Sequence, residues 1–166
     1  MPVLLRALPA AFAALLFCLC TADVRAQTPV PLRTTDPSVY RALGEEPGIV
    51  LLVDDFVARN LADPRTREPF RGINLRNLKK HIAEQFCHVS GGPCVYTGDT
   101  MRAAHQGYDI TRAQFNAVVE NLQAAMDARD VPFAVQRRFL AVLAPMYRDI
   151  VVPPGSAPAA PRPAAP

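Results

Sequence analysis

The fold is decided by the stretch Gly91-Gly92-Pro93-Cys94-Val95-Tyr96-Thr97-Gly98, which is followed two residues later by Met101-Arg102-Ala103-Ala104-His105-Gln106-Gly107. A glycine pair followed by proline is typical of the end of a helix. The stretch therefore places one histidine, His105, on a short segment that begins at a turn. Either His105 binds a metal-containing group, or the chain is a small helical domain with a few histidines.

Apolar residues on both sides of this stretch recur three and four positions apart, as they do in helices that bury one face. The pattern predicts four helices, at about residues 47–61, 75–89, 111–126 and 132–150. Thr111 and Gln114 predict a capping box at the start of the third helix. Pro145 predicts a bend in the fourth. No run alternates with a period of two, so we expect an all-α protein.

The two ends of the chain differ in composition from its middle. Residues 1–26 combine an early arginine with a short run of Ala, Leu and Phe, which is typical of a secretory signal peptide. The run is too short for a comfortable membrane span, although an uncleaved anchor is the alternative. We expect a linker at 27–37, a folded domain at 38–152 and a disordered Pro/Ala-rich tail at 153–166. The predicted location is therefore the periplasm, with no stable membrane domain after cleavage.

Cleavage after residue 26 would change the net charge and the number of cysteines. Removing the two arginines and one aspartate of residues 1–26 leaves 16 basic and 14 acidic residues, a net charge of +2 that does not indicate nucleic-acid binding. Two of the four cysteines also leave, so Cys87 and Cys94 remain. In an oxidising compartment these two residues, separated by a glycine turn, are expected to form a disulfide. The alternative is a buried Cys87 and a free Cys94.

A series of short motifs in the folded part resembles the group I truncated haemoglobins over about residues 39–151. The motifs are Gly44, Asp54-Asp55-Phe56, Leu61-Ala62-Asp63, Phe70, Leu78-Lys79, Gly91-Gly92-Pro93, Tyr96-Thr97-Gly98, Met101, His105-Gln106-Gly107, Ile110-Thr111 and Phe115. Each motif alone is weak, but their order and spacing are those of the family. The resemblance implies a two-over-two helical sandwich around haem b, and iron that binds oxygen, nitric oxide or carbon monoxide.

The resemblance also implies roles for individual residues. His105 matches the proximal histidine that binds the haem iron, and Phe70 matches the phenylalanine that stacks on the porphyrin. Further positions match the apolar lining of the haem: Phe56, Val57, Leu78, Ile82, Phe86, Met101, Ile110, Phe115 and Val119. Three match polar groups near the haem propionates: Lys79, Tyr96 and Arg102.

The chain departs from the family on the distal side of the haem. Val57 replaces a tyrosine that commonly donates a hydrogen bond to bound dioxygen, and Leu78 and Ile82 replace frequent glutamines. Such a charge-assisted hydrogen bond contributes about 1.5–3 kcal/mol. Without it oxygen is expected to leave faster, so simple oxygen storage is disfavoured. Gln85 could supply the missing hydrogen bond or admit water.

His81 lies between Leu78 and Ile82, where some cyanobacterial members carry a histidine that binds the iron as a sixth ligand. We expect His81 either to bind iron in this way or to point to solvent beside the neighbouring lysines. His88, near the helix end, is expected on the surface or at the disulfide loop. A zinc site built from these histidines and the two cysteines would not match common ligand spacings.

The sequence leaves two main classes of function open. One is a binding or electron-transfer module that exchanges electrons with an unknown partner or senses gas. The other is a haem enzyme with nitric oxide dioxygenase or peroxidase activity, which would need a reductant partner because the chain has no flavin or nicotinamide motif. A third class, a helical adaptor that has lost its haem, is disfavoured by the presence of both Phe70 and His105.

Overall fold

The computed structural model describes residues 33–34 and 36–152. The predicted signal peptide, most of the predicted linker and the predicted tail lie outside these residues. All regular elements of the described part are helices, which confirms the all-α prediction. They are α1 (Ser38–Ala42), α2 (Glu45–Ala62), the 3-10 helix η1 (Glu68–Phe70), α3 (Leu75–Val89), α4 (Met101–His105), α5 (Arg112–Asp127), α6 (Phe133–Leu143), the 3-10 helix η2 (Ala144–Met146) and α7 (Tyr147–Ile150).

The helix ends show how local sequence determines the elements. The predicted capping box is present, because Thr111 Oγ1 accepts from the backbone N–H of Gln114 while the Gln114 side chain accepts from the N–H of Thr111. The predicted last helix is divided into α6, η2 and α7 around Pro145. Proline has no N–H for the helical ladder and its ring displaces the carbonyl four residues earlier. No helix among the described residues is both long and apolar enough to cross a membrane.

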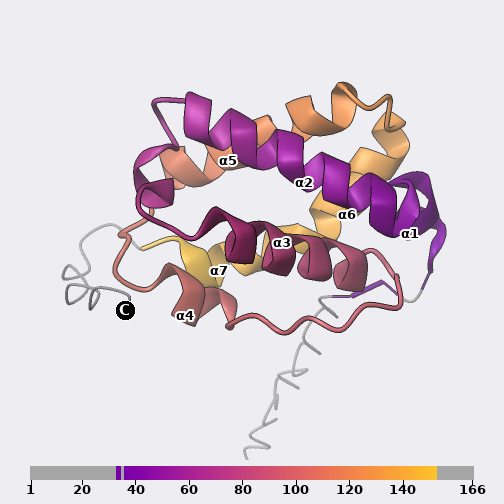
Figure 1. Ribbon diagram of the computed structural model, residues 1–166, viewed down its shortest axis with the longest axis horizontal. Helices are drawn as coiled ribbons and strands as arrows, with labels where there is room; N and C mark the ends of the chain where they lie inside the picture. Colours follow the sequence, from indigo (N-terminus) through magenta and orange to yellow (C-terminus); the bar gives the residue numbers. More distant parts are fainter. Residues whose placement is uncertain (1–32, 35, 153–166) are drawn as a thin grey trace, which may run out of the picture.

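The helices form two layers, as the two-over-two prediction requires. One layer consists of α2 and α3, which pack against each other, and the other contains α5 and α6. The layers meet where α2 contacts α5 and α3 contacts α6. The short helix α4 packs against α7. Figure 1 shows the segment between α3 and α4 running back beneath α3 without regular structure.

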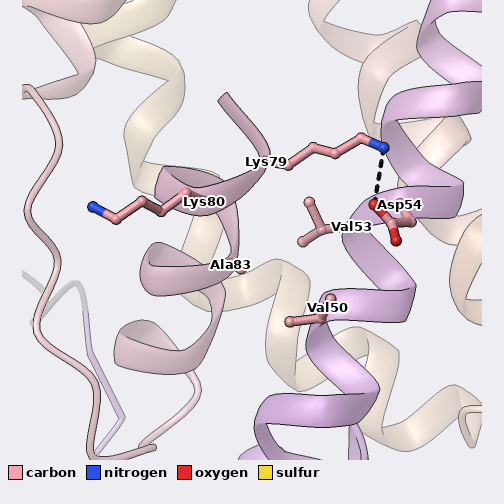
Figure 2. Close-up of a pocket in the computed structure, with 6 residues that line it drawn as sticks. All are labelled: Val50, Val53, Asp54, Lys79, Lys80 and Ala83. Atoms are coloured by element: carbon pink, nitrogen blue, oxygen red, sulfur yellow. Dashed lines mark ion pairs between the residues drawn. The ribbon is translucent and has the colours of Figure 1, made fainter. Parts of the chain in front are cut away.

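A small hollow lies at the contact between α2 and α3 (Figure 2). Val50, Val53 and Ala83 line it, and an ion pair of 2.9 Å between Lys79 Nζ and Asp54 Oδ1 borders it. Of the residues that were predicted to contact haem, only Lys79 lines this hollow. The hollow is therefore distinct from the predicted cofactor slot.

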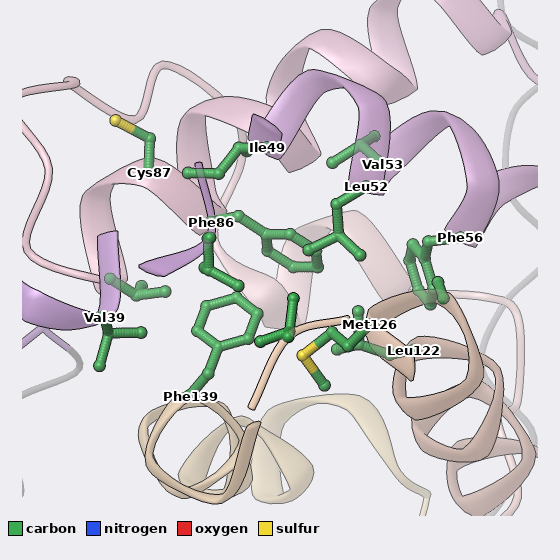
Figure 3. Packing of buried hydrophobic residues seen from close by; sticks show 14 of the residues in the cluster. Val39, Ile49, Leu52, Val53, Phe56, Phe86, Cys87, Leu122, Met126 and Phe139 are labelled. Atoms are coloured by element: carbon green, nitrogen blue, oxygen red, sulfur yellow. The ribbon is translucent and has the colours of Figure 1, made fainter. Parts of the chain in front are cut away.

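The hydrophobic core fills the space between α2, α3, α5 and α6 (Figure 3). Phe86 of α3 and Phe139 of α6 meet edge to face with ring centroids 5.0 Å apart, an arrangement that aromatic quadrupoles favour. Ile49 and Val57 of α2 and Met126 of α5 are fully buried. Burying each such side chain contributes about 1.5–3 kcal/mol, so this core stabilises the contacts between the helices.

The end of α3 is fixed by a glycine cap. Gly91 adopts a left-handed conformation (φ +92°), and the N–H of Gly92 donates to the carbonyl of Cys87 at 2.8 Å. Together with the bond from Gly91 N–H to the His88 carbonyl, this is a Schellman motif. The N–H of Thr34 donates to the carbonyl of Val89 at 3.0 Å, so the described end of the predicted linker contacts the same helix end.

Candidate functional site

His105 is the last residue of α4, and its imidazole is held from within that helix. Thr100 caps the start of α4 by accepting from the N–H of Ala103. One turn later, Nδ1 of His105 lies 2.8 Å from the carbonyl oxygen of Met101. Because a carbonyl oxygen only accepts, Nδ1 must carry a proton, and Nε2 is the nitrogen that would bind a metal. Metal-binding histidines generally have this second hydrogen bond, which fixes the tautomer and the ring.

The predicted haem-contacting apolar residues divide into two groups by burial. Four are buried: Phe56, Val57, Phe86 and Ile110. Six are half-buried: Phe70, Leu78, Ile82, Met101, Phe115 and Val119. The first group is covered by the protein itself, whereas the second retains apolar surface that a large apolar group would cover. Partly exposed apolar side chains of this kind would suit the apolar faces of a porphyrin.

Gln85 of α3 contacts methionines of α4 and of η2. Its amide Nε2 lies 3.3 Å from Sδ of Met101 on α4 and 3.7 Å from Sδ of Met146 in η2. A thioether sulfur is a weak acceptor. The amide N–H of Gln85 is therefore engaged only in weak hydrogen bonds. Whether it donates a distal hydrogen bond stays a prediction.

His81 lies on α3 in a polar cluster with Glu84 and Tyr96. Nδ1 of His81 lies 3.2 Å from Oε2 of Glu84, three residues later on the same helix. The imidazole meets the Tyr96 ring edge to face with centroids 6.5 Å apart. The side chain is 37% exposed, so it is neither buried in the core nor fully turned to solvent. His81 thus stands at an edge of the site with one nitrogen hydrogen-bonded.

Glu84 is the centre of this cluster, and the sequence did not reveal its role. Hydrogen bonds from the Thr97 hydroxyl first, and then from Lys80, lower the pKa of Glu84 to about 2. The distances to Oε2 are 2.7 Å from Thr97 Oγ1 and 3.1 Å from the Thr97 backbone nitrogen. The spacing of His81 and Glu84 could have indicated their contact. Nothing in the sequence spacing indicates the contact between Thr97 and Glu84.

The three predicted propionate ligands are engaged with groups of the protein. Tyr96 donates its hydroxyl to the carbonyl of Asp99 at 2.6 Å, and burial raises its pKa. Lys79 pairs with Asp54 at 2.9 Å (Figure 2), and Arg102 pairs with Asp149 at 2.7 Å. Both ion pairs are exposed and therefore weak. Propionate binding by these residues stays a prediction.

The predicted disulfide is present. Cys87 and Cys94 are bonded with Cα atoms 5.7 Å apart, which ties the end of α3 to the segment that leads to α4. His88 belongs to this loop, because its Nδ1 lies 3.1 Å from the carbonyl oxygen of Cys94. His88 is therefore at the disulfide loop, as expected.

An all-helical two-over-two fold with a histidine oriented by a backbone carbonyl is the arrangement expected of a globin. Residues 38–151 match the family model of the bacterial-like globins. A group 1 truncated hemoglobin of Mycolicibacterium paratuberculosis is 34% identical over 119 residues, which cover 71% of this chain and 88% of that protein. One from Tetrahymena thermophila is 31% identical, covering 54% of this chain and 74% of that protein.

Solved structures agree with these relatives. The Fe(III) form of truncated hemoglobin from Tetrahymena pyriformis superposes with a TM-score of 0.66 at 28% identity, covering 68% of this chain and 97% of that one. A hemoglobin from Synechococcus with covalently attached heme gives a TM-score of 0.64 at 25% identity, covering 68% and 97%. This chain belongs to the bacterial-like globins and, among them, to the group I truncated haemoglobins.

The cofactor of this family is haem b, and the residues of this chain fit it. His105 has the tautomer that a haem ligand needs, because its Nδ1 is bonded to Met101. Partly exposed apolar side chains on α3, α4 and α5 provide surface for a porphyrin. When bound, haem iron supplies a coordination position for diatomic gases and one-electron chemistry.

Proposed function

We propose that this protein is an exported haem protein in which His81 opposes His105 as a sixth ligand, and that it transfers electrons or senses diatomic gas. The observation that carries the proposal is the contact between His81 and Glu84. Glu84 is ionised at neutral pH, so its oxygens only accept, and Nδ1 of His81 must carry the proton. With Nδ1 donating to Glu84, a neutral His81 would have its lone pair on Nε2, the nitrogen that could then bind iron.

The apolar distal side supports the same proposal. Val57 is fully buried, and Leu78 and Ile82 are half-buried; none of these side chains can donate a hydrogen bond. Bound dioxygen gains about 1.5–3 kcal/mol from a donor in such a site. The amide of Gln85, which contacts two sulfurs, is the remaining candidate for a distal hydrogen-bond donor. A site of this kind favours ligand sensing or electron transfer over oxygen storage.

A protein side chain in the sixth coordination position would also regulate gas binding. An incoming gas binds only to the fraction of molecules in which His81 has left the coordination position, and its apparent affinity falls by that fraction. Glu84 would hold the imidazole through Nδ1 in the orientation in which Nε2 can bind iron. The affinity for gas would therefore depend on how firmly His81 is held.

The test is the absorption spectrum of the dithionite-reduced protein. We expect low-spin bands in the wild type and high-spin bands in the His81→Ala variant. His88→Ala is the matched control, because it removes a histidine of the same helix that contacts the disulfide loop, and it should stay low-spin. A high-spin wild type would contradict ligation by His81.

A turnover assay distinguishes the enzymatic alternative from the proposed function. Nitric oxide dioxygenase activity would convert nitric oxide and oxygen to nitrate when an artificial reductase keeps the iron reduced. We expect turnover to be slow in the wild type, because His81 would occupy the position that both gases need. Fast, sustained nitrate production would favour the enzyme.

Export is the remaining part of the proposal. The disulfide between Cys87 and Cys94 supports an oxidising compartment, because such bonds are rare in a reducing cytosol. Mass spectrometry of the protein from a periplasmic extract should give a chain that begins near Gln27 and has no free thiol. A full-length chain retained in the cytosol would contradict export.

A further inference from the structure

The segment between α3 and α4 contacts the candidate distal ligand through Glu84. Thr97 gives Glu84 Oε2 two hydrogen bonds, at 2.7 Å from its hydroxyl and 3.1 Å from its backbone N–H. The same carboxylate oxygen lies 3.2 Å from Nδ1 of His81. Tyr96, next to Thr97, packs its ring against the imidazole. Two consecutive residues of this segment therefore hold His81 in its place.

The disulfide anchors that segment close to these contacts. Cys94 lies three residues before Thr97 and is bonded to Cys87 on α3. Between Gly92 and Thr100 the segment has no regular secondary structure, and Figure 1 shows it extended beneath α3. Cutting the bond would lengthen the untethered part of the segment and raise the entropic cost of keeping Thr97 on Glu84.

We infer that the Cys87–Cys94 disulfide regulates iron ligation by His81, with Glu84 as the positioning residue between them. The inference rests on the proposed function, because it requires His81 to be a ligand. With the disulfide intact, Thr97 fixes Glu84, and Glu84 fixes the ring of His81 with Nε2 available for iron. With the disulfide cleaved, Glu84 keeps only its helical neighbours, including Lys80 at 3.0 Å, and His81 is held less firmly.

The redox step is a thiol–disulfide exchange with a dithiol protein. One thiolate of the dithiol attacks Sγ of Cys94, which forms a mixed disulfide and releases Cys87 as a thiolate. The second thiolate of the dithiol then attacks the dithiol's own sulfur in the mixed disulfide and releases Cys94. The dithiol ends as a disulfide, and its two electrons and two protons are transferred to Cys87 and Cys94, which end as thiols. Cys94 is the accessible sulfur, because it is half-buried beside the exposed Pro93 and Val95, whereas Cys87 is buried.

The experiment measures carbon monoxide binding to the ferrous full-length holoprotein by stopped flow, together with its low-spin fraction. The Cys87→Ser/Cys94→Ser variant represents the cleaved state. We expect it to bind carbon monoxide severalfold faster than the disulfide-bonded wild type and to have a smaller low-spin fraction. Thr97→Val, with the disulfide intact, should shift both quantities in the same direction. This second variant also tests the inference if the serine variant does not fold.

The outcomes distinguish the inference from the proposed function. A high-spin wild type would overturn the proposed function. A low-spin wild type whose binding rate is unchanged in the serine and Thr97→Val variants would overturn the inference alone. In a His81→Ala background, the cysteine substitutions should have no effect on the rate. An equal acceleration there would show that the disulfide merely stiffens the whole site, and would also overturn the inference.

Discussion

Nδ1 of His105 and the carbonyl oxygen of Met101 lie 2.8 Å apart within a single five-residue helix. A helix this short is not stable alone, because nucleation is unfavourable and few bonds follow it. Its order depends on its packing against α7 and on the cap from Thr100. The position of His105, the predicted iron ligand, therefore depends in part on a hydroxyl five residues before it.

Replacing Thr100 by alanine is expected to loosen the haem. Loss of an N-cap costs about 1 kcal/mol, which corresponds to roughly a fivefold change in an equilibrium. We expect haem transfer to apomyoglobin to become about fivefold faster, because the cap contributes about that free energy to the helix that carries His105. Thr100→Ser keeps the acceptor oxygen and should transfer haem at the wild-type rate. Equal rates in the alanine and serine variants would contradict this role for the cap.

A glutamine at position 78 is expected to restore a distal hydrogen bond. Leu78 is half-buried, and glutamine has a similar length, so the substitution adds a donor without a large change in volume. In a His81→Ala background, dioxygen dissociation from Leu78→Gln should slow by about ten- to a hundredfold. Carbon monoxide is less polar when bound, so its dissociation should change little. Equal slowing of both gases would indicate a steric effect instead.

Helix positions could be predicted because apolar spacing and capping are local. The glycine pair after Val89 and the capping box at Thr111 lie within a few residues of the helix ends that they form. The predicted disulfide needed only a turn of the right length between its cysteines. The helix α4 was not among the four predicted helices: the sequence placed His105 only on a short segment that begins at a turn, and the five-residue helix there depends on packing with α7.

The polar cluster at the site could not be predicted in the same way. Thr97 reaches Glu84 only because the segment after the disulfide turns back along α3. That path is set by tertiary packing, for which the sequence has no local pattern. The same holds for Thr34. The composition of its segment predicted a linker, but the backbone N–H of Thr34 donates to the carbonyl of Val89.

Substitution of Gly91 by alanine is expected to destabilise the fold. A left-handed residue other than glycine costs about 1–3 kcal/mol. At Gly91 an added Cβ would also lie 2.7 Å from the carbonyl oxygen of Asp36. Gly72 is the matched control, because it has a φ of +71° and open space around a Cβ. Urea unfolding should show a larger loss of free energy for Gly91→Ala than for Gly72→Ala, and equal losses would exclude the contact with Asp36.

The ion pair between Asp63 and Arg65 is expected to make stability depend on pH in acid. Hydrogen bonds from the Arg65 side chain, and then from its backbone N–H, lower the pKa of Asp63 from 3.8 to about 2. A carboxyl group whose pKa is lower in the folded protein stabilises the fold above its unfolded pKa. That contribution should be complete above about pH 4 and should disappear as the pH falls towards 2.

The Asp63→Asn variant tests this expectation, because asparagine keeps an acceptor for the backbone of Arg65 but loses the charge. Its thermal unfolding midpoint should lie below that of the wild type at pH 6, and the two midpoints should converge as the pH approaches 2. In an Arg65→Gln background the substitution should have a smaller effect, because the main cause of the lowered pKa is gone while the backbone hydrogen bond remains. A difference between wild type and Asp63→Asn that stays constant from pH 6 to pH 2 would show that the charge of Asp63 does not stabilise the fold.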